Sequence, residues 1–370
     1  MITGFYSPLP PARTGVADYS ASVLCELRQH GTVKTSPDTC DISLYHIGNN
    51  QLHANVYQQS LARPGVVVLH DALLHHFYLG SFRQNIYIEE FVYNYGEWAR
   101  EEAESLWQDR ALSAQDPRYF ERPMLRRIAS SALAVVVHNP AAARAVHQHS
   151  PATPVFEIPH FVDPAPSPPA EQVSWFRSRL NAGPNGFVFA IFGFLRESKR
   201  LVPALQAFQK LHRLQPETRL LVAGEFVSQD LERAASGFLG QPGVCRLPHL
   251  SEWELQMAAA SVDCCLNLRY PNAGETSGIA MRLMAAGKPV IVTDGEEWSH
   301  IPDDCLLRIP AGPAEAAALF EAMALLSGSP EIGRFIGQQA ASHVQRYHSL
   351  SRSGAEYWNL LCRTFASRSC

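Results

Sequence analysis

The residues best suited to chemistry lie in a polar turn, 270–278, that follows an apolar run at 262–268. The turn contains Asn272, Gly274 and Glu275, and an apolar helical pattern follows it. This order predicts a strand, a loop and a helix. In such units a ligand sits at the carboxyl end of the strand, against the positive amino end of the following helix. We therefore expect a ligand at this turn.

A second candidate is the basic loop 195–200, which reads Leu-Arg-Glu-Ser-Lys-Arg. It follows a buried-strand pattern at 187–194 and precedes a helix with apolar spacing at 201–214. Positive charge, the helix dipole and free backbone amides converge at such a position, so the loop is suited to bind an anion. An exposed turn with three scattered cations is the alternative interpretation.

Polar side chains also follow three apolar segments in the first half of the chain, at 41–47, 65–69 and 132–137. In a parallel sheet the carboxyl ends of the strands share one edge and present side chains to a cleft. An adjacent His-Asp pair there is either a catalytic dyad or a structural hydrogen bond. The residues at these ends that we assign to a site are Asn49, His70, Asp71 and His138.

A proline-rich turn, 7–15, connects the first strand pattern to the first helix pattern. Gly15 would let the backbone approach a ligand closely, whereas the prolines stiffen the connection. The turn does not match the GxGxxG pattern of dinucleotide-binding proteins, so a rigid strand-helix connection explains it equally well.

The elements that would position these residues alternate between strand and helix in both halves, which predicts open parallel sheets covered by helices. Around 161–185 the composition changes to a proline-rich stretch, DPAPSPPA, followed by a short helical pattern. We place the domain boundary there. The length of 370 residues agrees with two domains of roughly 100–200 residues each.

Composition narrows the class of protein. Charged residues make up 18% and the net charge is -4, so no overall positive field favours nucleic acid as a partner. Eight cysteines are scattered without CxxC spacing, which indicates free thiols in a reducing cytoplasm. Without a leader pattern or an apolar run of about 18 residues, we expect neither secretion nor a membrane span. Arg122, Arg126 and Arg127 could contact an anionic lipid surface or face solvent on a helix.

Three blocks of the second half read FGFLRESKR, AGE and LNLRYPNAGETSGIAMRLMAAGKPVIVTD, and SPLPPARTGVADYS, YHIGNN and VVVLHD precede them. Together these blocks span nearly the whole chain and resemble the group 1 (family 4) retaining glycosyltransferases. GETSG with AAGKPVIVTD is the most specific part. The resemblance implies an α/β architecture, the GT-B fold, in which two Rossmann-like, doubly wound parallel-sheet domains face an interdomain cleft.

The resemblance also implies the limits of the domains. An N-terminal, acceptor-side domain would cover 1–165 and be completed by a returning C-terminal helix within 348–370. Residues 166–185 would be the linker. The C-terminal domain, 186–347, would bind the nucleotide sugar.

Roles for single residues follow from the same resemblance. Lys199 would bind the diphosphate of the donor, and Glu275 would hold hydroxyls of the transferred sugar. Both are catalytic candidates together with His70, which would orient the donor sugar or the acceptor hydroxyl. Asn49, Asp71 and His138 would line the acceptor side. The remaining candidates for donor binding are Gly15, Arg196, Thr276, Ser277, Gly278 and Arg282.

Two positions depart from the family pattern. Phe194 replaces an arginine that usually follows the glycine of the basic loop, and Arg196 is the candidate substitute. Arg282 stands where the family has a second glutamate, which usually holds the ribose. Lying about two helical turns beyond Glu275, Arg282 should project from nearly the same face, toward the nucleotide. The replacement by Arg282 therefore affects the predicted binding of the ribose more than that of the diphosphate.

The expected activity is that of a retaining, hexosyltransferase-like glycosyltransferase. It would move a sugar from a UDP- or GDP-linked donor to a glycan, lipid-linked or small-molecule acceptor, as in polysaccharide biosynthesis. No Asp-x-Asp pair ends a predicted strand, so we expect neither a metal nor another cofactor. The protein would work in the cytoplasm, with peripheral contact at the inner face of the membrane. The alternatives are a non-catalytic sugar-nucleotide-binding or scaffold protein and a nucleotide-sugar epimerase of the same fold.

Overall fold

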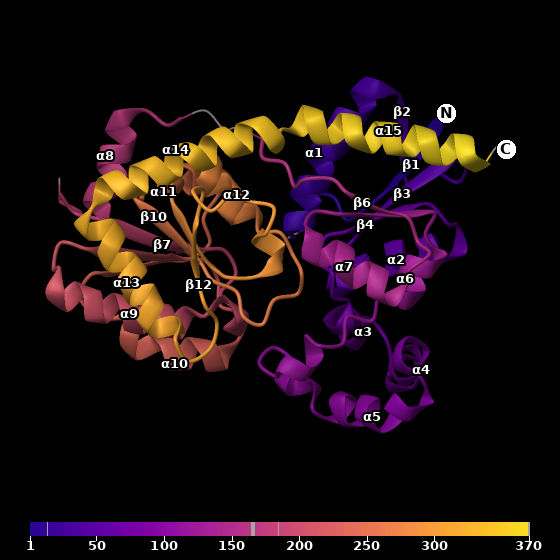
Figure 1. Ribbon diagram of the computed structural model, residues 1–370, viewed down its shortest axis with the longest axis horizontal. Coiled ribbons are helices and arrows are strands. Elements are labelled where there is room, and N and C mark those ends of the chain that lie inside the picture. Colours follow the sequence, from indigo (N-terminus) through magenta and orange to yellow (C-terminus); the bar gives the residue numbers. More distant parts are fainter. Residues whose placement is uncertain (13, 164–166, 184, 369–370) are drawn as a thin grey trace. The chain divides into compact units, whose positions relative to one another are not determined.

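The computed structural model describes residues 1–12, 14–163, 167–183 and 185–368 (Figure 1). The predicted boundary at 165–166 and the predicted end at Cys370 lie outside the described residues. The chain forms two compact units. The N-terminal unit comprises Met1–Phe161, Pro271–Thr276 and His348–Cys370, and the C-terminal unit comprises Val162–Tyr270 and Ser277–Tyr347.

The N-terminal unit is built on a six-stranded sheet in the order β2-β1-β3-β4-β5-β6, in which all neighbours are parallel. Every residue of β3 and β4 is buried, as expected for strands covered on both faces. The strands are β1 Ile2–Tyr6, β2 Thr32–Thr35, β3 Ile42–Ile47, β4 Val66–Leu69, β5 Ala134–Val137 and β6 Val155–Glu157.

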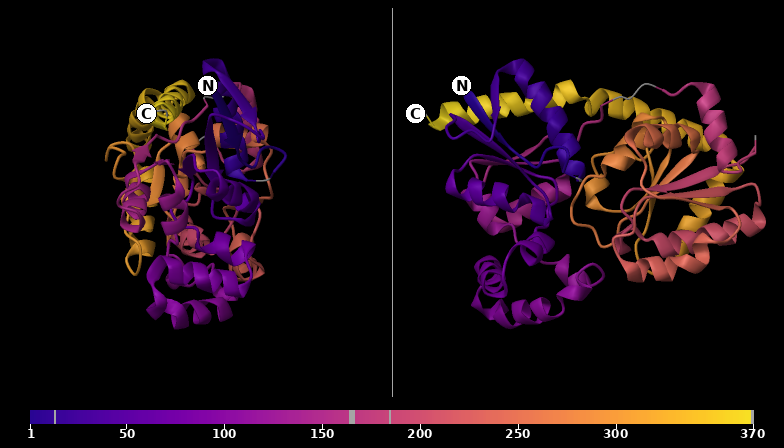
Figure 2. Two further views of the ribbon diagram at one scale, coloured as in Figure 1. Left: turned by 90° about the vertical axis from the view of Figure 1, so that its right-hand side faces the viewer. Right: turned by 180° about the vertical axis from the view of Figure 1, so that it is seen from behind.

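Helices cover both faces of this sheet, and three of them, α3, α4 and α5, lie at one end of the unit away from the sheet (Figures 1 and 2). The last helix, α15, packs against α1, where the hydroxyls of Tyr19 and Tyr357 are 3.0 Å apart. The helices are α1 Gly15–His30, α2 Ala54–Ala62, α3 His75–Ser81, α4 Gln84–Tyr95, α5 Arg100–Gln108, α6 Arg126–Ser131, α7 Pro140–His149 and α15 Leu350–Arg368.

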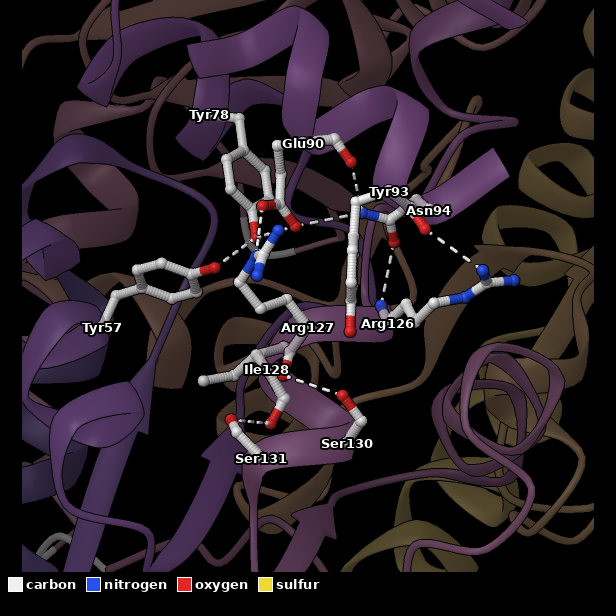
Figure 3. Close-up of polar contacts among 10 residues, drawn as sticks. All are labelled: Tyr57, Tyr78, Glu90, Tyr93, Asn94, Arg126, Arg127, Ile128, Ser130 and Ser131. Atoms are coloured by element: carbon white, nitrogen blue, oxygen red, sulfur yellow. Dashed lines mark hydrogen bonds and ion pairs between the residues drawn. The ribbon is translucent and has the colours of Figure 1, made fainter. Parts of the chain in front are cut away.

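A buried carboxylate connects α4 to the neighbouring helices (Figure 3). Glu90 is 6% exposed and accepts hydrogen bonds from Tyr78, Asn94 and Arg127. Burial raises the pKa of Glu90, while these hydrogen bonds act in the opposite direction. The network therefore ties α3, α4 and α6 together.

For Arg122, Arg126 and Arg127 the sequence allowed contact with either a lipid surface or solvent. In the structure all three donate hydrogen bonds to other residues of the same chain. Arg122 forms two hydrogen bonds with Glu102, at 2.8 and 3.0 Å. Arg126 donates to the carbonyl of Tyr93, and Arg127 pairs with Glu90. These contacts stabilise the packing of α4, α5 and α6.

The C-terminal unit repeats the architecture, with six parallel strands in the order β12-β11-β10-β7-β8-β9. The expected pair of doubly wound parallel sheets is thereby confirmed. Its strands are β7 Val188–Phe192, β8 Arg219–Ala223, β9 Val244–Leu247, β10 Cys264–Asn267, β11 Val290–Thr293 and β12 Leu307–Ile309.

Apolar spacing explains how the helices of this unit attach. In α9 the residues at 201, 204, 205, 208 and 211 are buried, which is one face of a helix of 3.6 residues per turn. The stretch expected as a linker contains α8, which packs against α11. The helices are α8 Ala170–Arg179, α9 Leu201–Leu214, α10 Gln229–Leu239, α11 Glu252–Ser261, α12 Gly278–Ala285, α13 Glu315–Gly328 and α14 Pro330–Tyr347. Short 3-10 helices occur at Gln51–His53, Glu97–Ala99, Arg110–Leu112, Pro117–Tyr119, Glu197–Lys199 and Glu296–Trp298.

Candidate functional site

Ser277 fixes the amino end of α12 against the carboxyl end of β10. Its hydroxyl accepts the backbone N–H of Ala280 at 3.3 Å and donates to Asn267 Oδ1 at 3.0 Å. Arg269 Nη2 also donates to this hydroxyl, at 3.2 Å. The side chain of Ser277 is therefore used as a helix cap. A ligand here would meet the backbone amides at 277 and 278, as well as the guanidinium of Arg269.

Two cations lie at the carboxyl edge of the C-terminal sheet. Lys199 Nζ donates to the carbonyl of Phe192, the last residue of β7, at 2.7 Å. Lys199 and Arg269 both act on the buried thiol of Cys265, where their charges oppose the desolvation that raises its pKa to about 12. The two cations therefore lie near one point of the sheet, beside the amino end of α12.

A backbone hydrogen bond holds the basic loop next to the polar turn. The N–H of Tyr270 donates to the carbonyl of Ser198 at 2.7 Å. The two loops that sequence singled out separately are thus neighbours within the C-terminal unit. Sequence reasoning did not nominate Arg269, although its position just after an apolar strand was a usable signal.

The other cations of the basic loop have different surroundings. Arg200 has a left-handed backbone, with φ 57°, and its guanidinium binds the carboxylate of Glu315 on α13. Glu315 is only 2% exposed, so this ion pair anchors the start of α9. Arg196 is exposed to solvent. The loop therefore contains one structural arginine, one exposed arginine and Lys199 at the sheet edge.

Two glycines bring the ends of β7 and β8 together below this loop. Gly224 has φ +148°, and a Cβ there would lie 2.0 Å from the carbonyl oxygen of Gly193. Gly193 has φ +82°, and a Cβ there would lie 3.0 Å from Lys199 Nζ. Gly224 needs glycine because a side chain would collide with the backbone of Gly193, and Gly193 needs it because its positive φ disfavours other residues.

Residues 271–276 of the polar turn pack within the N-terminal unit. Asn139, at the carboxyl end of β5, donates from Nδ2 to the carbonyl of Gly274 and to Thr276 Oγ1, both at 3.0 Å. Gly274 has φ +71°, and a Cβ there would lie 2.6 Å from the Cβ of Ala72. Asn139 was known from sequence only as a strand end. It proves to be the residue that holds this segment.

Glu275 is half-buried within the same segment. Its Oε2 accepts the backbone N–H of Ala273 at 2.9 Å, and Asn272 Oδ1 accepts that of Gly274 at 2.6 Å. These two bonds fix the conformation of the turn and orient the carboxylate of Glu275.

Arg282 forms an ion pair with the first residue of α11. Its Nη1 lies 3.0 and 2.8 Å from the two carboxylate oxygens of Glu252. The side chain that sequence directed toward a nucleotide is thus held by a carboxylate of the neighbouring helix. Arg282 and Glu252 are 41% and 61% exposed, so both remain accessible to solvent.

A cluster of imidazoles lies at the carboxyl edge of the N-terminal sheet. The ring of His70 lies 5.2 Å from that of His138 and 4.9 Å from that of Tyr19. His70 Nε2 is 3.0 Å from His46 Nδ1, and the ring of His160 meets that of His138 edge to face, with centroids 5.6 Å apart. The structure therefore brings together two predicted site residues, His70 and His138, and adds Tyr19, His46 and His160.

Burial keeps three of these imidazoles, those of His46, His70 and His138, neutral. Desolvation, followed by the neighbouring histidines, holds the pKa of His70 well below its usual 6.5. Desolvation lowers the pKa of His138 to about 4, although a hydrogen bond to the carbonyl of Ile158 acts in the other direction. That bond comes from Nδ1 at 2.9 Å, so His138 Nε2 carries a lone pair. His46, His70 and His138 are therefore neutral at physiological pH.

Asp71 and Asn49 form a separate network. Asp71 Oδ2 accepts the backbone N–H of Asn49 at 2.7 Å. Asn49 Oδ1 accepts the N–H of Phe77 in α3 at 2.8 Å, and its amide nitrogen lies 3.2 Å from His76 Nδ1. The hydrogen bonds of Asn49 therefore join β3 to α3. Asp71 positions this connection, while the adjacent His70 turns to His46.

Gly15 begins α1 and is exposed. The side chain of Thr14 caps the helix by accepting the N–H of Val16. A Cβ at position 15 would meet no atom within 4 Å. The role of Gly15 in bringing the backbone close to a ligand therefore stays a prediction.

Two kinds of feature are absent from the described residues. Within the ranges that the structure describes, no three or more His, Cys, Asp or Glu side chains are arranged to hold a metal ion. In the same ranges, none of the helices combines the length and the apolar character that crossing a bilayer requires.

The fold matches solved structures although the sequence is remote. No family model and no curated protein matches the chain. A sucrose-phosphate synthase from Thermosynechococcus elongatus superposes with a TM-score of 0.71 at 15% identity, covering 99% of this chain and 100% of that one. The fold is GT-B.

Two further structures agree. HepE from Anabaena, solved with UDP and glucose, has a TM-score of 0.67 at 15% identity, and the match covers 98% of this chain and 100% of that one. WaaG, a glycosyltransferase involved in lipopolysaccharide biosynthesis, has a TM-score of 0.63 at 16% identity, covering 98% and 99%. In all three structures the match extends over nearly the whole length of both chains.

Proposed function

We propose that the protein is a hexosyltransferase-like glycosyltransferase that uses a nucleotide sugar as donor. The observation that carries this proposal is the pair of cations, Lys199 and Arg269, beside the amino end of α12 at the sheet edge of a GT-B unit. A diphosphate suits such a site because two positive charges and a helix terminus all favour an anion. HepE has been solved with UDP-glucose, which supports UDP donors as the first to test, with GDP donors next.

The proposed chemistry uses these charges on the leaving group. Breaking the bond between sugar and phosphate leaves a diphosphate of high negative charge, and preorganised cations stabilise the charge that develops. Lys199 and Arg269 would carry that part of the work without a metal, and Arg196 is accessible for an outer phosphate oxygen. The amides of Thr276, Ser277 and Gly278 would support it.

Glu275 and the imidazole cluster would serve the sugar and the acceptor. The carboxylate of Glu275, oriented by the N–H of Ala273, is suited to accept hydrogen bonds from hydroxyls of the transferred sugar. We propose reaction on one face of the sugar with retention of configuration, the donor phosphate taking the proton of the acceptor. His70 would contact a glycan, lipid-linked or small-molecule acceptor, in polysaccharide synthesis at the inner face of the membrane, and the buried His138 would pack behind it on the acceptor side.

The first test is calorimetric titration of UDP and GDP, followed by hydrolysis assays on a panel of donor sugars. Lys199→Ala should weaken binding of the diphosphate by about 10- to 100-fold, the usual value of a charged hydrogen bond. Lys34→Ala is the matched control, because Lys34 is exposed on the edge strand β2 of the other unit. Equal affinity in wild type and Lys199→Ala would contradict the assignment of this site.

A non-catalytic sugar-nucleotide-binding protein is the second candidate. The observation that favours it is the ion pair of Arg282 with Glu252, which stands where the resembling family has a carboxylate for ribose. Nucleotide binding without turnover on any donor of the panel would support this candidate and exclude transfer.

A further inference from the structure

His46 and His70 share a hydrogen bond that joins two neighbouring strands. His46 belongs to β3, and His70 follows β4 directly. Their facing atoms, Nδ1 of His46 and Nε2 of His70, are 3.0 Å apart, and the rings stack with an interplanar angle of 24°. His46 is fully buried, whereas His70 is half-buried. A ligand at this edge can therefore meet His70 and not His46.

A single proton occupies the contact between the two nitrogens. Burial and the surrounding histidines hold the pKa of both rings well below 6.5, so both are neutral at pH 7. A neutral imidazole has one N–H and one lone pair. Two arrangements are then possible: His46 donates and His70 carries its own proton on Nδ1, or His70 donates and His46 carries its own proton on Nε2.

The surroundings of His46 distinguish these arrangements. Its Nε2 is buried without a hydrogen-bond partner, and the rings of Phe5 and Tyr19 lie 4.9 and 6.2 Å from its own. A proton on this atom would be a buried donor without an acceptor, which is rare in folded proteins. A buried lone pair is tolerated more often. The lower-energy arrangement leaves the lone pair on His46 Nε2.

We propose that His46 is a positioning residue, which donates from Nδ1 to His70 Nε2 and thereby fixes His70 as the tautomer protonated on Nδ1. Nδ1, the other ring nitrogen of the half-buried His70, is then an N–H donor. The edge-to-face contact of Tyr19 with His70, at 78° between the rings, holds the ring in this orientation.

This tautomer determines what His70 does, a step that rests on the proposed function. An Nδ1–H group donates a hydrogen bond to an oxygen of the ligand, either a hydroxyl or a phosphate oxygen. It does not take a proton from an acceptor hydroxyl, since its only lone pair faces His46. His70 is therefore a hydrogen-bond donor to the nucleotide sugar or its acceptor and not the general base.

The tautomer is measurable without any substrate. In the ligand-free protein labelled with ¹⁵N-histidine, long-range ¹H–¹⁵N correlation spectra at pH 7.5 distinguish a protonated ring nitrogen from an unprotonated one. The spectrum of His70→Gln identifies the His70 signals by their loss. We expect protonated Nδ1 and unprotonated Nε2 in wild-type His70. The reverse assignment would overturn the proposal, and this measurement needs no folded variant of His46.

His46→Phe tests the cause. Phenylalanine keeps an aromatic ring beside Phe5 and Tyr19 but removes the donor, so His70 should shift toward protonated Nε2. A spectrum of His70 unchanged in folded His46→Phe would show that His46 does not set the tautomer. Donor turnover should fall by roughly tenfold, the value of one hydrogen bond. If the tautomer changes and turnover does not, the assignment of His70 to the ligand fails while the role of His46 stands.

Discussion

At the scale of single residues, Arg269 is the cation that the structure adds to the candidate site. Its backbone N–H donates to Thr293 Oγ1 at 3.0 Å, so the residue is fixed between β10 and β11. We expect Arg269→Gln to weaken UDP binding by about 10- to 100-fold, because a charged donor is replaced by a neutral one. Calorimetric titration measures this. Arg233→Gln, on an arginine 77% exposed in α10, is the control and should bind UDP as wild type does.

Whether the hydrogen-bond partner of a side chain could be predicted depended on how far apart the two residues lie in the sequence. Ser277 could be recognised as a helix cap because its partner Ala280 is three residues away. The contact of His46 with His70 spans 24 residues, and that of Asn139 with Thr276 spans 137. Such partners depend on which strands become neighbours, so residue types alone could not reveal them.

At the scale of elements, the helical region of the N-terminal unit depends on the buried carboxylate of Glu90. Glu90→Gln keeps the shape but leaves the guanidinium of Arg127 without its carboxylate, and Arg127 is 38% exposed. We expect a loss of about 1–3 kcal/mol in stability, less than for a fully buried pair. Glu89→Gln is the matched control, since Glu89 is 67% exposed and its pairing with Arg100 should contribute less than about 1 kcal/mol. Equal urea denaturation midpoints for the two variants would contradict this role.

The contact of α11 with α12 gives a second prediction for elements. Arg282→Glu places two carboxylates together and should destabilise the pair of helices, whereas Glu252→Arg with Arg282→Glu restores opposite charges. Because the pair is exposed, the coupling should amount to about 0.2–1 kcal/mol. A double-mutant cycle from thermal unfolding measures it. UDP titration of the same variants tests the pair as a ligand site, and unchanged affinity in all of them would exclude a contact with the nucleotide.

The elements themselves were predictable where the apolar pattern was long. The helix expected at 201–214 is α9, and the strand expected at 262–268 contains β10. Sequence gave no signal for β2 or β9, because both are short edge strands whose residues are mostly not fully buried. An edge strand lacks the continuous apolar run that distinguishes a central strand of a parallel sheet.

At the scale of the whole molecule, the alternation of strand and helix was sufficient to predict two parallel sheets. Each helical crossover buries one face of its helix on the sheet. The spacing of apolar residues therefore predicts parallel strands connected by helices. The sequence did not predict that the polar turn is divided between the two units. Residues 271–276 pack with the N-terminal unit although the flanking β10 and α12 belong to the C-terminal unit. That packing depends on Gly274 fitting against Ala72, a contact between distant parts of the chain.

Two buried histidines of the N-terminal unit, His53 and His138, make the stability of that unit depend on pH. Burial lowers the pKa of His53 and of His138 to about 4, from about 6.5 in the unfolded chain. Above pH 6.5 both states are neutral and stability does not change. As the pH falls from 6.5 to 4, these two histidines bind protons in the unfolded chain but stay unprotonated in the folded one. The free energy of unfolding therefore decreases, by about 2 kcal/mol per histidine at pH 5. Below pH 4 the loss levels off.

Hydrogen exchange measured by mass spectrometry separates this effect from a general response to acid. After correction for the intrinsic exchange rate, amides of β3, β4 and β5 should lose several kcal/mol of protection between pH 7 and pH 5. Amides of β7 and β8 serve as the internal control, because their buried side chains are apolar. His147→Gln, at an exposed position of α7, should leave the difference between the two sheets unchanged. Equal losses in both sheets would show that the buried histidines do not carry the pH dependence.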